Sequence, residues 1–395
     1  MRNTRVLISG ASVAGPALAF WLGRFGFCPT IVELAPQLRS GGHAVDFRGA
    51  THRTVLERMG ILDELRELRT GGSPMSFVNA SGRELLHLPG EFTGGELEVR
   101  RGDLAALLHR HSEDRAEYLF GDSVTAISEQ PDGVRVAFQH GPERTFDLVI
   151  GADGIHSRTR QLVFGPEERF VRHLGYYVAG WRTPNPGFAA TEGTVMYNEP
   201  GRGVGLAVDP RDTSWAHATL FLASPRLPIH HRDVQAQKRM LADAFAGTGW
   251  HARALLATLD GADDLYFDSI SRADLPSWSK GRVALIGDAA CGATLGGMGT
   301  GTAITAAYVL AGELATAEGD HITAFAAYEA RLRGFAERCQ QGGDRTGRFL
   351  APKGRLGAAL RNRMLSTRPM LDMMLRAGEK VTTLDGMPHY AGAAA

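Results

Sequence analysis

Two neighbouring stretches constrain the fold most, residues 6–15 (V-L-I-S-G-A-S-V-A-G) and residues 30–33 (T-I-V-E). The first leads from an apolar, β-branched run into a turn at Gly10 and then into a helix, and the second ends a strand at Glu33. Gly15 would let the helix lie close on the first strand, so a pyrophosphate could rest on the N–H groups of the helix start. The Glu33 carboxylate could then accept hydrogen bonds from ribose hydroxyls. The sequence therefore predicts a nucleotide-binding βαβ unit.

Ser12 departs from the usual pattern, because it gives G-x-S-x-x-G where G-x-G-x-x-G is typical. We expect serine to be tolerated if its φ angle is negative. One alternative is an ordinary glycine turn in a βαβ unit that binds no ligand. A second is a secretory or membrane segment, since residues 6–23 carry no charge. Three glycines and Pro16 interrupt that run, and the strand that follows completes the βαβ unit, so we reject the second alternative.

The composition is that of an ordinary enzyme-sized chain. Of its 395 residues 44% are hydrophobic, enough for large cores and two or more domains. Lys and Arg equal Asp and Glu at 43 each, so we expect no nucleic-acid or membrane partner. The cysteines Cys28, Cys291 and Cys339 form no C-x-x-C pattern, which favours the reducing cytoplasm. Neither His109 with His111 nor His230 with His231 has metal-ligand spacing, so no metal is expected.

A change of pattern marks a second domain. From about residue 175 to 267, aromatic residues, prolines and alternating strands replace the βαβ rhythm, and a hairpin is expected within residues 75–98. We predict an α/β fold with a discontinuous nucleotide-binding domain and an inserted β-rich domain. The first comprises residues 1–74, 99–174 and 268–320, the second residues 75–98 and 175–267. C-terminal helices occupy residues 321–395, with one helix expected near residues 322–340.

Two further motifs follow predicted strands. In residues 151–160 (G-A-D-G-I-H-S-R-T-R) a strand delivers Asp153 to a turn that Gly154 permits, and Ser157 is expected to cap the next helix. In the third motif of the chain, Asp288 ends a strand and residues 296–301 (G-G-M-G-T-G) form a glycine-lined loop before a long helix. A strand-end aspartate can bind a sugar-alcohol hydroxyl, and bare N–H groups at the helix start can lie beside a planar ring.

With these three motifs in this order and spacing, the chain resembles the FAD-dependent aromatic hydroxylases from residue 5 to about residue 340. These class A flavoprotein monooxygenases include p-hydroxybenzoate hydroxylase and the tetracycline-inactivating monooxygenases. The resemblance implies a Rossmann-like FAD-binding domain, an inserted β-sheet substrate domain and a C-terminal helical segment. It also implies that NADPH or NADH reduces FAD and that O₂ forms a flavin C4a-hydroperoxide. One oxygen atom then enters an aromatic, polyketide-like or tetracycline-like small molecule.

The resemblance further implies which residues hold FAD. The first motif and Glu33 would bind the ADP half, Arg101 of the R-x-x-L element would contact the cofactor, and Asp288 would bind the ribityl chain. Asp153 and Gly154 match the D-G motif that serves both FAD and NAD(P)H. The full expected set is Gly10, Ser12, Val13, Ala14, Gly15, Glu33, Leu34, Arg39, Arg101, Asp153, Gly154, Asp288, Gly297, Met298, Gly299 and Thr300.

Some departures from the family pattern lie beside the expected flavin ring. Cys291 replaces the common histidine, Gly301 replaces the usual asparagine, and residues 292–295 lack the usual proline. We expect these changes to affect the position of the ring more than FAD binding. Cys291 is interpreted as a small buried residue in preference to a redox or covalent-flavin residue.

The substrate is expected between the β-rich domain and the flavin. Candidate walls are Trp181, Met196, Tyr197, His217 and Phe221. The alternative is that each belongs to the hydrophobic core, which is favoured for any single aromatic residue. No general base is evident, and Arg48 is the one candidate for a role near the flavin edge or the nicotinamide path. The apolar stripe within residues 368–375 suggests packing or a dimer face, so the protein is expected to be a monomer or homodimer.

Two other functions stay open from the sequence. One is a different FAD-dependent oxidoreductase, such as a reductase or halogenase. The other is a flavin-binding protein that sequesters its ligand without turnover, because its ring loop is altered.

Overall fold

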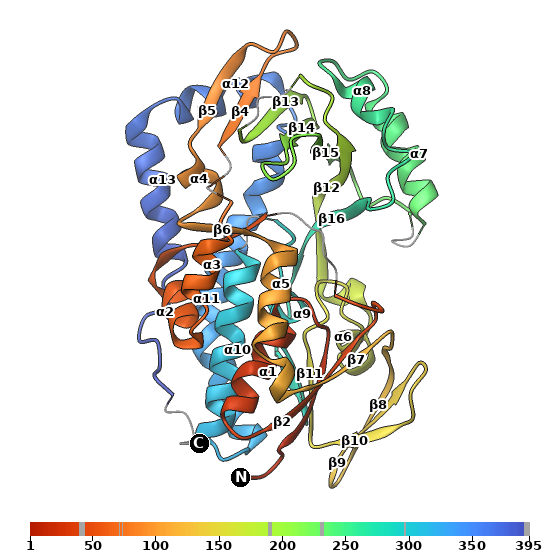
Figure 1. Cartoon of the computed structure of the whole chain (residues 1–395), viewed down its shortest axis with the longest axis vertical. Helices are drawn as coiled ribbons and strands as arrows, with labels where there is room; N and C mark the ends of the chain where they lie inside the picture. Colours follow the sequence, from red (N-terminus) through yellow and green to blue (C-terminus); the bar gives the residue numbers. More distant parts are fainter. Residues whose placement is uncertain are drawn as a thin grey trace.

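The computed structural model describes residues 1–38, 44–70, 72, 74–188, 192–229, 233–295 and 298–390. These residues form two large sheets, one in each half of the molecule as seen in Figure 1, with long C-terminal helices running beside both.

The central strands of the sheet in the lower half are buried and mostly apolar, as is typical of a parallel sheet covered on both faces. The described residues form it in the order β17 (Ser279–Lys280), β18 (Val283–Leu285), β11 (Leu148–Gly151), β1 (Arg5–Ser9), β2 (Cys28–Glu33) and β7 (Glu117–Phe120). All of them are parallel except β17. Because β18, β11 and β1 are parallel neighbours, their carboxyl ends lie side by side at one edge.

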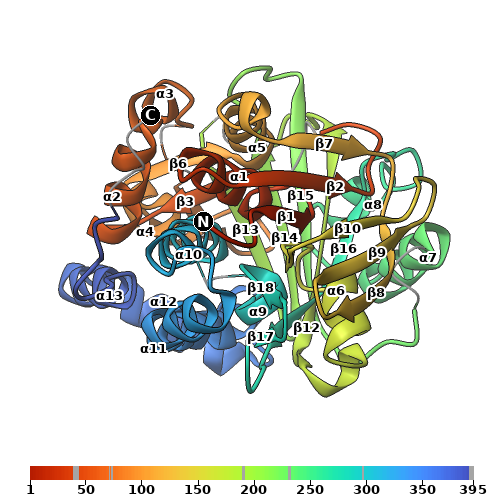
Figure 2. The same cartoon turned by 90° about the horizontal axis from the view of Figure 1, so that it is seen from below.

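Helices cover one face of this sheet. The 18-residue α10 (Gly299–Thr316) is buried along most of its length and packs between α1 (Ala14–Arg24) and α11 (His321–Leu350), as Figure 2 shows. Beside them lie α5 (Arg101–Arg110), α2 (Gly49–Met59), α3 (Leu62–Glu67), α4 (Gly90–Gly94) and the paired strands β3 (Ala44–Phe47) and β6 (Leu97–Arg100). The opposite face packs against the antiparallel strands β8 (Val124–Gln130), β9 (Gly133–Phe138) and β10 (Arg144–Phe146).

The described residues also form a seven-stranded sheet in the upper half. Its order is β16 (Tyr266–Ala273), β12 (Val171–Pro184), β15 (Trp215–Ala223), β14 (Arg202–Val208), β13 (Thr194–Glu199), β4 (Met75–Val78) and β5 (Glu84–Leu88). The hairpin of β4 and β5 thus joins strands from more than a hundred residues later. One face packs on α7 (Val234–Phe245) and α8 (Ala252–Leu256), and part of the other packs on the end of α11 and on α12 (Arg355–Leu365).

The C-terminal helices connect the two halves. The helix expected near residues 322–340 is α11, which begins at His321 and continues to Leu350, so its last turns reach the second sheet. After α12 and α13 (Arg368–Val381) the chain returns to α10, where the Tyr390 hydroxyl donates to Glu313 Oε1 at 2.5 Å. Met370 and Leu371 of the apolar stripe pack on the core between the seven-stranded sheet and the end of α11, whereas Met373 and Met374 are exposed.

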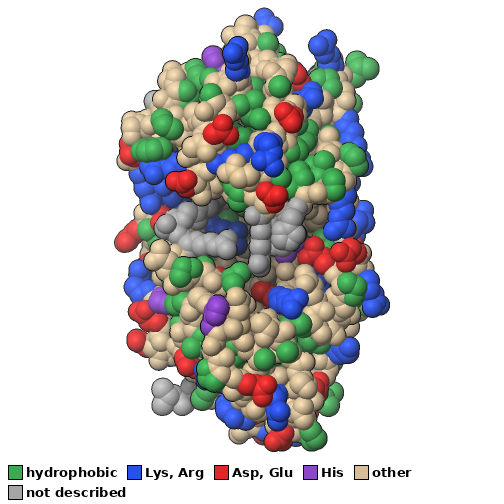
Figure 3. Space-filling model, turned by 90° about the vertical axis from the view of Figure 1, so that its right-hand side faces the viewer, with side chains coloured by type: hydrophobic (Ala, Val, Ile, Leu, Met, Phe, Trp, Pro, Cys, Tyr) green, Lys and Arg blue, Asp and Glu red, His purple; other side chains and the backbone are tan. Residues whose placement is uncertain are grey.

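The predicted fold class is confirmed, with its α/β architecture, inserted sheet and C-terminal helices. The domain boundaries stay a prediction. Among the described residues, none of the helices has the length and apolar character needed to cross a bilayer, and no cluster of three His, Cys, Asp or Glu side chains could bind a metal ion. On the face shown in Figure 3, acidic and basic side chains are interspersed over the described surface.

Candidate functional site

The turn between β1 and α1 brings the backbone unusually close to its neighbours. Gly10 has a φ of +109°, and a Cβ there would lie 2.6 Å from the Ala152 carbonyl oxygen. A Cβ on Gly15 would lie 1.9 Å from the Gly10 carbonyl oxygen, so both positions require glycine. Among the described residues no side chain caps the start of α1. Its first N–H groups and the positive end of its dipole are therefore available to an anion.

Side chains on both sides of this turn fix its shape. The Glu33 carboxylate accepts hydrogen bonds from the Ala11 N–H at 2.8 Å and the Ala35 N–H at 2.9 Å. Ser12 avoids a positive φ, as expected. Its Oγ also accepts a hydrogen bond at 2.8 Å from Nη2 of Arg101, the first residue of α5. The serine therefore has a partner that the sequence analysis missed, namely a residue of the expected FAD-binding set.

The second motif is a self-contained turn. The Asp153 carboxylate accepts hydrogen bonds from the Ser157 hydroxyl at 2.5 Å and from the Thr159 N–H at 2.8 Å. Gly154 has a φ of +78°, where a β-carbon would be strained. Ser157 Oγ accepts from the Arg160 N–H at 2.9 Å, which confirms the predicted cap of α6 (Arg158–Val163). Asp153 thus shapes the turn in which it lies.

Arg160 links this motif to the third one. Its side chain is fully buried, and it donates to the Ala289 carbonyl at 3.0 Å and to the Ile155 carbonyl at 2.5 Å. Ala289 belongs to α9 (Asp288–Cys291), which follows β18. A buried guanidinium thereby holds the turns after β11 and β18 at a fixed separation, with Glu167 at 3.7 Å as its ion-pair partner.

The Asp288 carboxylate is the polar group of the site that fits a hydroxyl-bearing ligand most clearly. Its side chain keeps some accessible surface, yet no described residue donates a hydrogen bond to its carboxylate. Burial raises the pKa of Asp288, and the nearby positive charge of Arg101 opposes that rise. A largely desolvated carboxylate without a donor is costly unless a ligand supplies one, and a hydroxyl group would do so.

The start of α10 lies beside this carboxylate. A Cβ on Gly299 would lie 3.0 Å from Asp288 Oδ1, so the first turn of the helix can approach the carboxylate because residue 299 is glycine. Met298 precedes the helix in the left-handed conformation with a φ of +52°. Within the described part of the chain no side chain caps α10, which leaves its N–H groups available to a negatively charged or electron-rich edge.

His52 explains why residue 301 is a glycine. A Cβ on Gly301 would lie 2.2 Å from His52 Cε1, because the imidazole fills the space in question. The ring is fully buried between Phe47 and Phe335, and its Nδ1 accepts a hydrogen bond from the Arg48 N–H at 3.2 Å. Burial lowers the pKa of His52 to about 4, so the imidazole is neutral. Nothing in the sequence pattern indicated this contact.

Other predicted residues have local partners. The Cys291 thiol lies 3.7 Å from the Gly287 carbonyl oxygen, and burial raises its pKa, so it is a thiol rather than a reactive thiolate. Arg48 pairs with Asp46 and donates to the Thr93 carbonyl at 2.9 Å. Val13, Ala14 and Thr300 lie at the starts of their helices, and Leu34 is exposed after β2. Arg39 and Gly297 lie outside the described residues.

Strand alternation separates the five candidate wall residues. His217 and Phe221 of β15 share one face of the seven-stranded sheet with Met196 of β13, the face toward α11. Trp181 lies on the opposite face, in the core under α7 and α8, where its Nε1 donates to Thr258 Oγ1 at 3.0 Å. Tyr197 also lies on that face, stacked on Trp250 at 6.2 Å. Trp181 and Tyr197 therefore have core roles. Met196 and Phe221 are buried as well, in the core between this sheet and the end of α11, so of the five only His217 is partly accessible.

A charged cluster that the sequence analysis missed joins the two sheets. His156 of the second motif places Nε2 at 3.0 Å from Asp268 Oδ1 of β16 and Nδ1 at 3.1 Å from Glu167. The pKa of His156 is raised to about 10, chiefly by its hydrogen bond to Asp268. Asp268 is 112 residues from His156, so the pairing depends on the tertiary fold alone.

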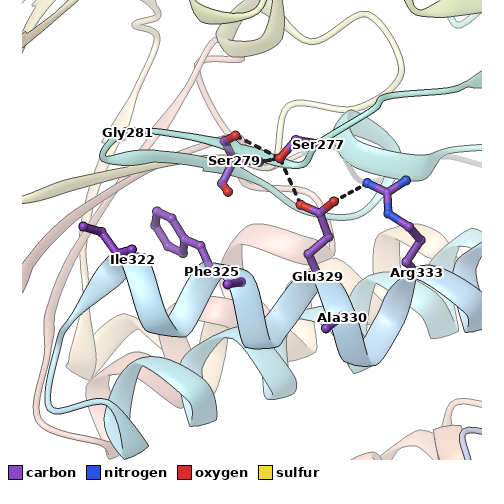
Figure 4. Close-up of a pocket in the computed structure, with 9 residues that line it drawn as sticks. Ser277, Ser279, Gly281, Ile322, Phe325, Glu329, Ala330 and Arg333 are labelled. Carbon is purple, nitrogen blue, oxygen red and sulfur yellow. Dashed lines mark hydrogen bonds and ion pairs between the residues drawn. The ribbon is translucent and has the colours of Figure 1, made fainter.

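A separate surface hollow lies between α11 and the segment before β17 (Figure 4). Its polar groups are already paired: Ser277 Oγ donates to Glu329 Oε2 at 3.1 Å, and Arg333 forms an ion pair with the other carboxylate oxygen. These contacts fasten the segment to α11, and the hollow contains none of the predicted site residues.

The fold and the site together define a flavoprotein with a Rossmann-like FAD-binding domain. Residues 3–341 match the FAD binding domain family, and the chain belongs to that family, the FAD-dependent aromatic hydroxylases. The glycine turn, the two uncapped helix starts and the Asp288 carboxylate fit the pyrophosphate, ring and ribityl hydroxyls of FAD.

Relatives in sequence and in structure are similar to this protein over most of the chain. An uncharacterized protein of Mycobacterium tuberculosis is 43% identical over 342 residues, covering 85% of this chain and 91% of that protein. A flavin-dependent monooxygenase of Legionella longbeachae is 38% identical over 348 residues, covering 87% and 88%. The structure of tetracycline destructase Tet(55) is 34% identical with a TM-score of 0.85, covering 98% and 99%. Klebsiella pneumoniae HpxO, solved with FAD and uric acid, shares the fold at 21% identity and a TM-score of 0.73, covering 95% and 97%.

Proposed function

We propose that this protein uses NADPH or NADH and O₂ to insert one oxygen atom into an aromatic, polyketide-like or tetracycline-like small molecule. The observation that carries the proposal is the placement of three motifs at one sheet edge. Ser9, Gly151 and Leu285 end the parallel neighbours β1, β11 and β18, and a glycine-containing turn follows each strand. A dinucleotide cofactor binds at such an edge.

Each motif has its own part in holding the cofactor. The start of α1 would hold the pyrophosphate together with Ser12 and Arg101, and Glu33 would bind the ribose. Asp288 would accept a hydrogen bond from the ribityl chain. Bound FAD, reduced by NADPH or NADH, would supply the oxygen-activating chemistry.

The residues of the chain itself would stabilise charge on the flavin ring and exclude water from it. The uncapped start of α10 would stabilise negative charge on a flavin ring placed beside it, because the positive end of the helix dipole and the N–H groups of the first turn would face the ring. The face of the seven-stranded sheet that carries the half-buried His217 would bind the substrate and keep water away. Met196 and Phe221 on the same face are buried in the core under the end of α11. Arg48, held by Asp46, is proposed to lie beside the flavin edge or the nicotinamide path.

Two comparisons favour this chemistry over a reductase or halogenase. The relative from Legionella longbeachae is named a flavin-dependent monooxygenase, and a structure with a TM-score of 0.85 is a tetracycline destructase. Tetracyclines are accordingly the first substrates to try, followed by polyphenols and aromatic polyketides.

The test measures NADPH oxidation in air by the FAD-loaded protein, with and without each compound, and the masses of the products. Substrate-stimulated consumption with a product heavier by one oxygen atom would support the proposal. NADPH consumption without such a product would indicate another oxidoreductase. A yellow protein that binds compounds but never consumes NADPH or NADH would indicate sequestration.

A further inference from the structure

An exposed apolar stripe runs along α12, which lies at the upper end of the molecule (Figure 1). Leu356, Leu360 and Met364 follow one another at four-residue intervals, so their side chains share one face of the helix. Leu356 is 88% exposed, Leu360 60% and Met364 42%. Leu356 has the largest exposed fraction among the large apolar residues that the structure describes. Single exposed leucines are common on soluble proteins, but three large apolar side chains in line form a patch.

The opposite side of α12 fixes this orientation. Leu365 is buried in the core beneath β4 and β5. The Arg361 guanidinium lies 3.8 Å from the centre of the Phe77 ring, and its Nη1 donates to the Phe349 carbonyl. Arg361 and Leu365 are four residues apart, so together they mark the inward face of the helix. The apolar stripe cannot turn inward without breaking these contacts.

Basic side chains surround the stripe. Residues 345–371 contain seven basic residues and no aspartate or glutamate, although the whole chain carries 43 residues of each sign. Six of the seven are exposed, the exception being Arg361. Arg355 and Arg363 of α12 form no ion pair with any carboxylate that the structure describes. The balanced charge of the whole chain therefore averages over a local positive excess. The seven residues are Arg345, Arg348, Lys353, Arg355, Arg361, Arg363 and Arg368.

This charge decides between the possible partners. A two-fold dimer through α12 would bring the same basic residues of two copies together, and their repulsion opposes it. A stable protein partner needs about 800 Å² on each side, whereas α12 offers one narrow stripe. The helix has 11 residues and is about 16 Å long, too short to cross a bilayer. Apolar side chains flanked by arginines instead suit a helix that lies in the interface of a bilayer with anionic headgroups.

We propose that the outer face of α12 docks on the surface of an anionic lipid bilayer. Leu356, Leu360 and Met364 enter the boundary between headgroups and acyl chains, while Arg355 and Arg363 bind lipid phosphates. Arg361 and Leu365 hold the helix on the protein in this orientation. The contact is peripheral. The inference goes beyond the proposed function and does not depend on it.

The test is co-sedimentation of the FAD-loaded full chain with vesicles, without NADPH or substrate. Vesicles of equal parts phosphatidylglycerol and phosphatidylcholine should bind the protein at least about tenfold more tightly than pure phosphatidylcholine, and raised ionic strength should weaken this binding. Arg355→Gln with Arg363→Gln should weaken it about 25-fold, because each basic residue near an anionic surface contributes about fivefold. Leu356→Gln with Leu360→Gln should weaken it at least about tenfold, because two apolar side chains no longer enter the bilayer.

Two matched controls distinguish α12 from the rest of the surface. Arg239→Gln with Arg253→Gln removes the same charge from exposed positions of α7 and α8, and Ile322→Gln replaces an apolar residue of α11 that is 72% exposed. Both should leave vesicle binding unchanged, and urea unfolding checks that every variant is folded.

Three results would overturn the proposal: no binding to the mixed vesicles, equal binding to both kinds of vesicle, or an equal loss of binding in the controls. A dimer that Leu356→Gln with Leu360→Gln dissociates, without vesicle binding, would also overturn it and make this face an interface between two copies. Because vesicle binding is measured without turnover, its failure leaves the proposed monooxygenase function standing, and absence of an oxygenated product leaves the lipid surface standing.

Discussion

The contact between Gly301 and His52 makes a sharp prediction about Gly301→Ala. The new Cβ would lie 2.2 Å from His52 Cε1 and 2.4 Å from Nδ1, and Phe47 and Phe335 flank the imidazole. Overpacking of this kind costs about 1–3 kcal/mol, and we expect the upper half of that range because the ring is fully buried. Alanine gains up to about 1 kcal/mol over glycine in a helix, which offsets part of the cost.

The assay is a double-mutant cycle in urea, with unfolding followed on the protein without added cofactor. His52→Ala frees the space that the new Cβ would enter, so in that background Gly301→Ala should be neutral or stabilising. A coupling of about 1–3 kcal/mol between the two sites is expected. Gly334→Ala in α11 is the control, since among the residues that the structure describes its Cβ would meet only Arg338 Nη1, at 3.8 Å. Equal effects of Gly301→Ala in both backgrounds would refute the packing explanation.

Three further predictions concern the site. Asp288→Ala should weaken FAD binding at least tenfold, because one hydrogen-bonded hydroxyl is lost; unchanged affinity by fluorescence titration would remove Asp288 from the site. Ser12→Gly should weaken FAD binding several-fold and leave riboflavin binding unchanged, because Ser12 holds Arg101 where the pyrophosphate would lie; equal or tighter FAD binding would return Ser12 to a merely tolerated residue. The pKa of His156 is raised from 6.5 to about 10, so the protonated imidazole stabilises the folded state. This stabilisation is fully present below pH 6.5 and is lost as pH rises through 10. After allowance for solvent screening this loss is about 1–2 kcal/mol between pH 7 and 10, and His156→Gln should abolish it in urea titrations.

The sequence predicted the parts of the site that follow strands directly. Each motif combines an apolar strand with a glycine turn and a polar residue, and parallel neighbours bring such strand ends to one edge. Gly10, Asp153 and Asp288 could therefore be placed beside one another without a structure. The cap at Ser157 was equally local, because the hydroxyl and the N–H it accepts from are three residues apart.

Contacts between distant segments could not be predicted. His52 and Gly301 meet only because α2 and α10 pack together, and His156 meets Asp268 only because β16 lies beside the second motif. Alternation along β12 and β15 indicated which residues share a face but not which face turns toward the cofactor. This is why Trp181, an apolar aromatic residue like Phe221, was placed among the candidate walls although it lies under α7 and α8.

The sequence pattern also did not predict how far α11 extends. Residues 341–350 contain two adjacent glycines and several polar residues, which argue against a helix interior. Packing overrides that preference: a Cβ on Gly347 would lie 2.4 Å from the Tyr176 ring, so glycine there allows the helix to approach the second sheet.

The central claim is that three motifs at one sheet edge hold FAD for oxygen insertion, and isotope labelling tests it most directly. The FAD-loaded protein is supplied with NADPH, a tetracycline and O₂ enriched in the heavy oxygen isotope, and the product is weighed by mass spectrometry; polyphenols and aromatic polyketides are assayed in the same way. The account predicts a product that carries one heavy oxygen atom and whose formation stops in Asp288→Ala. NADPH consumption with every compound but no label from O₂ in any product would contradict it.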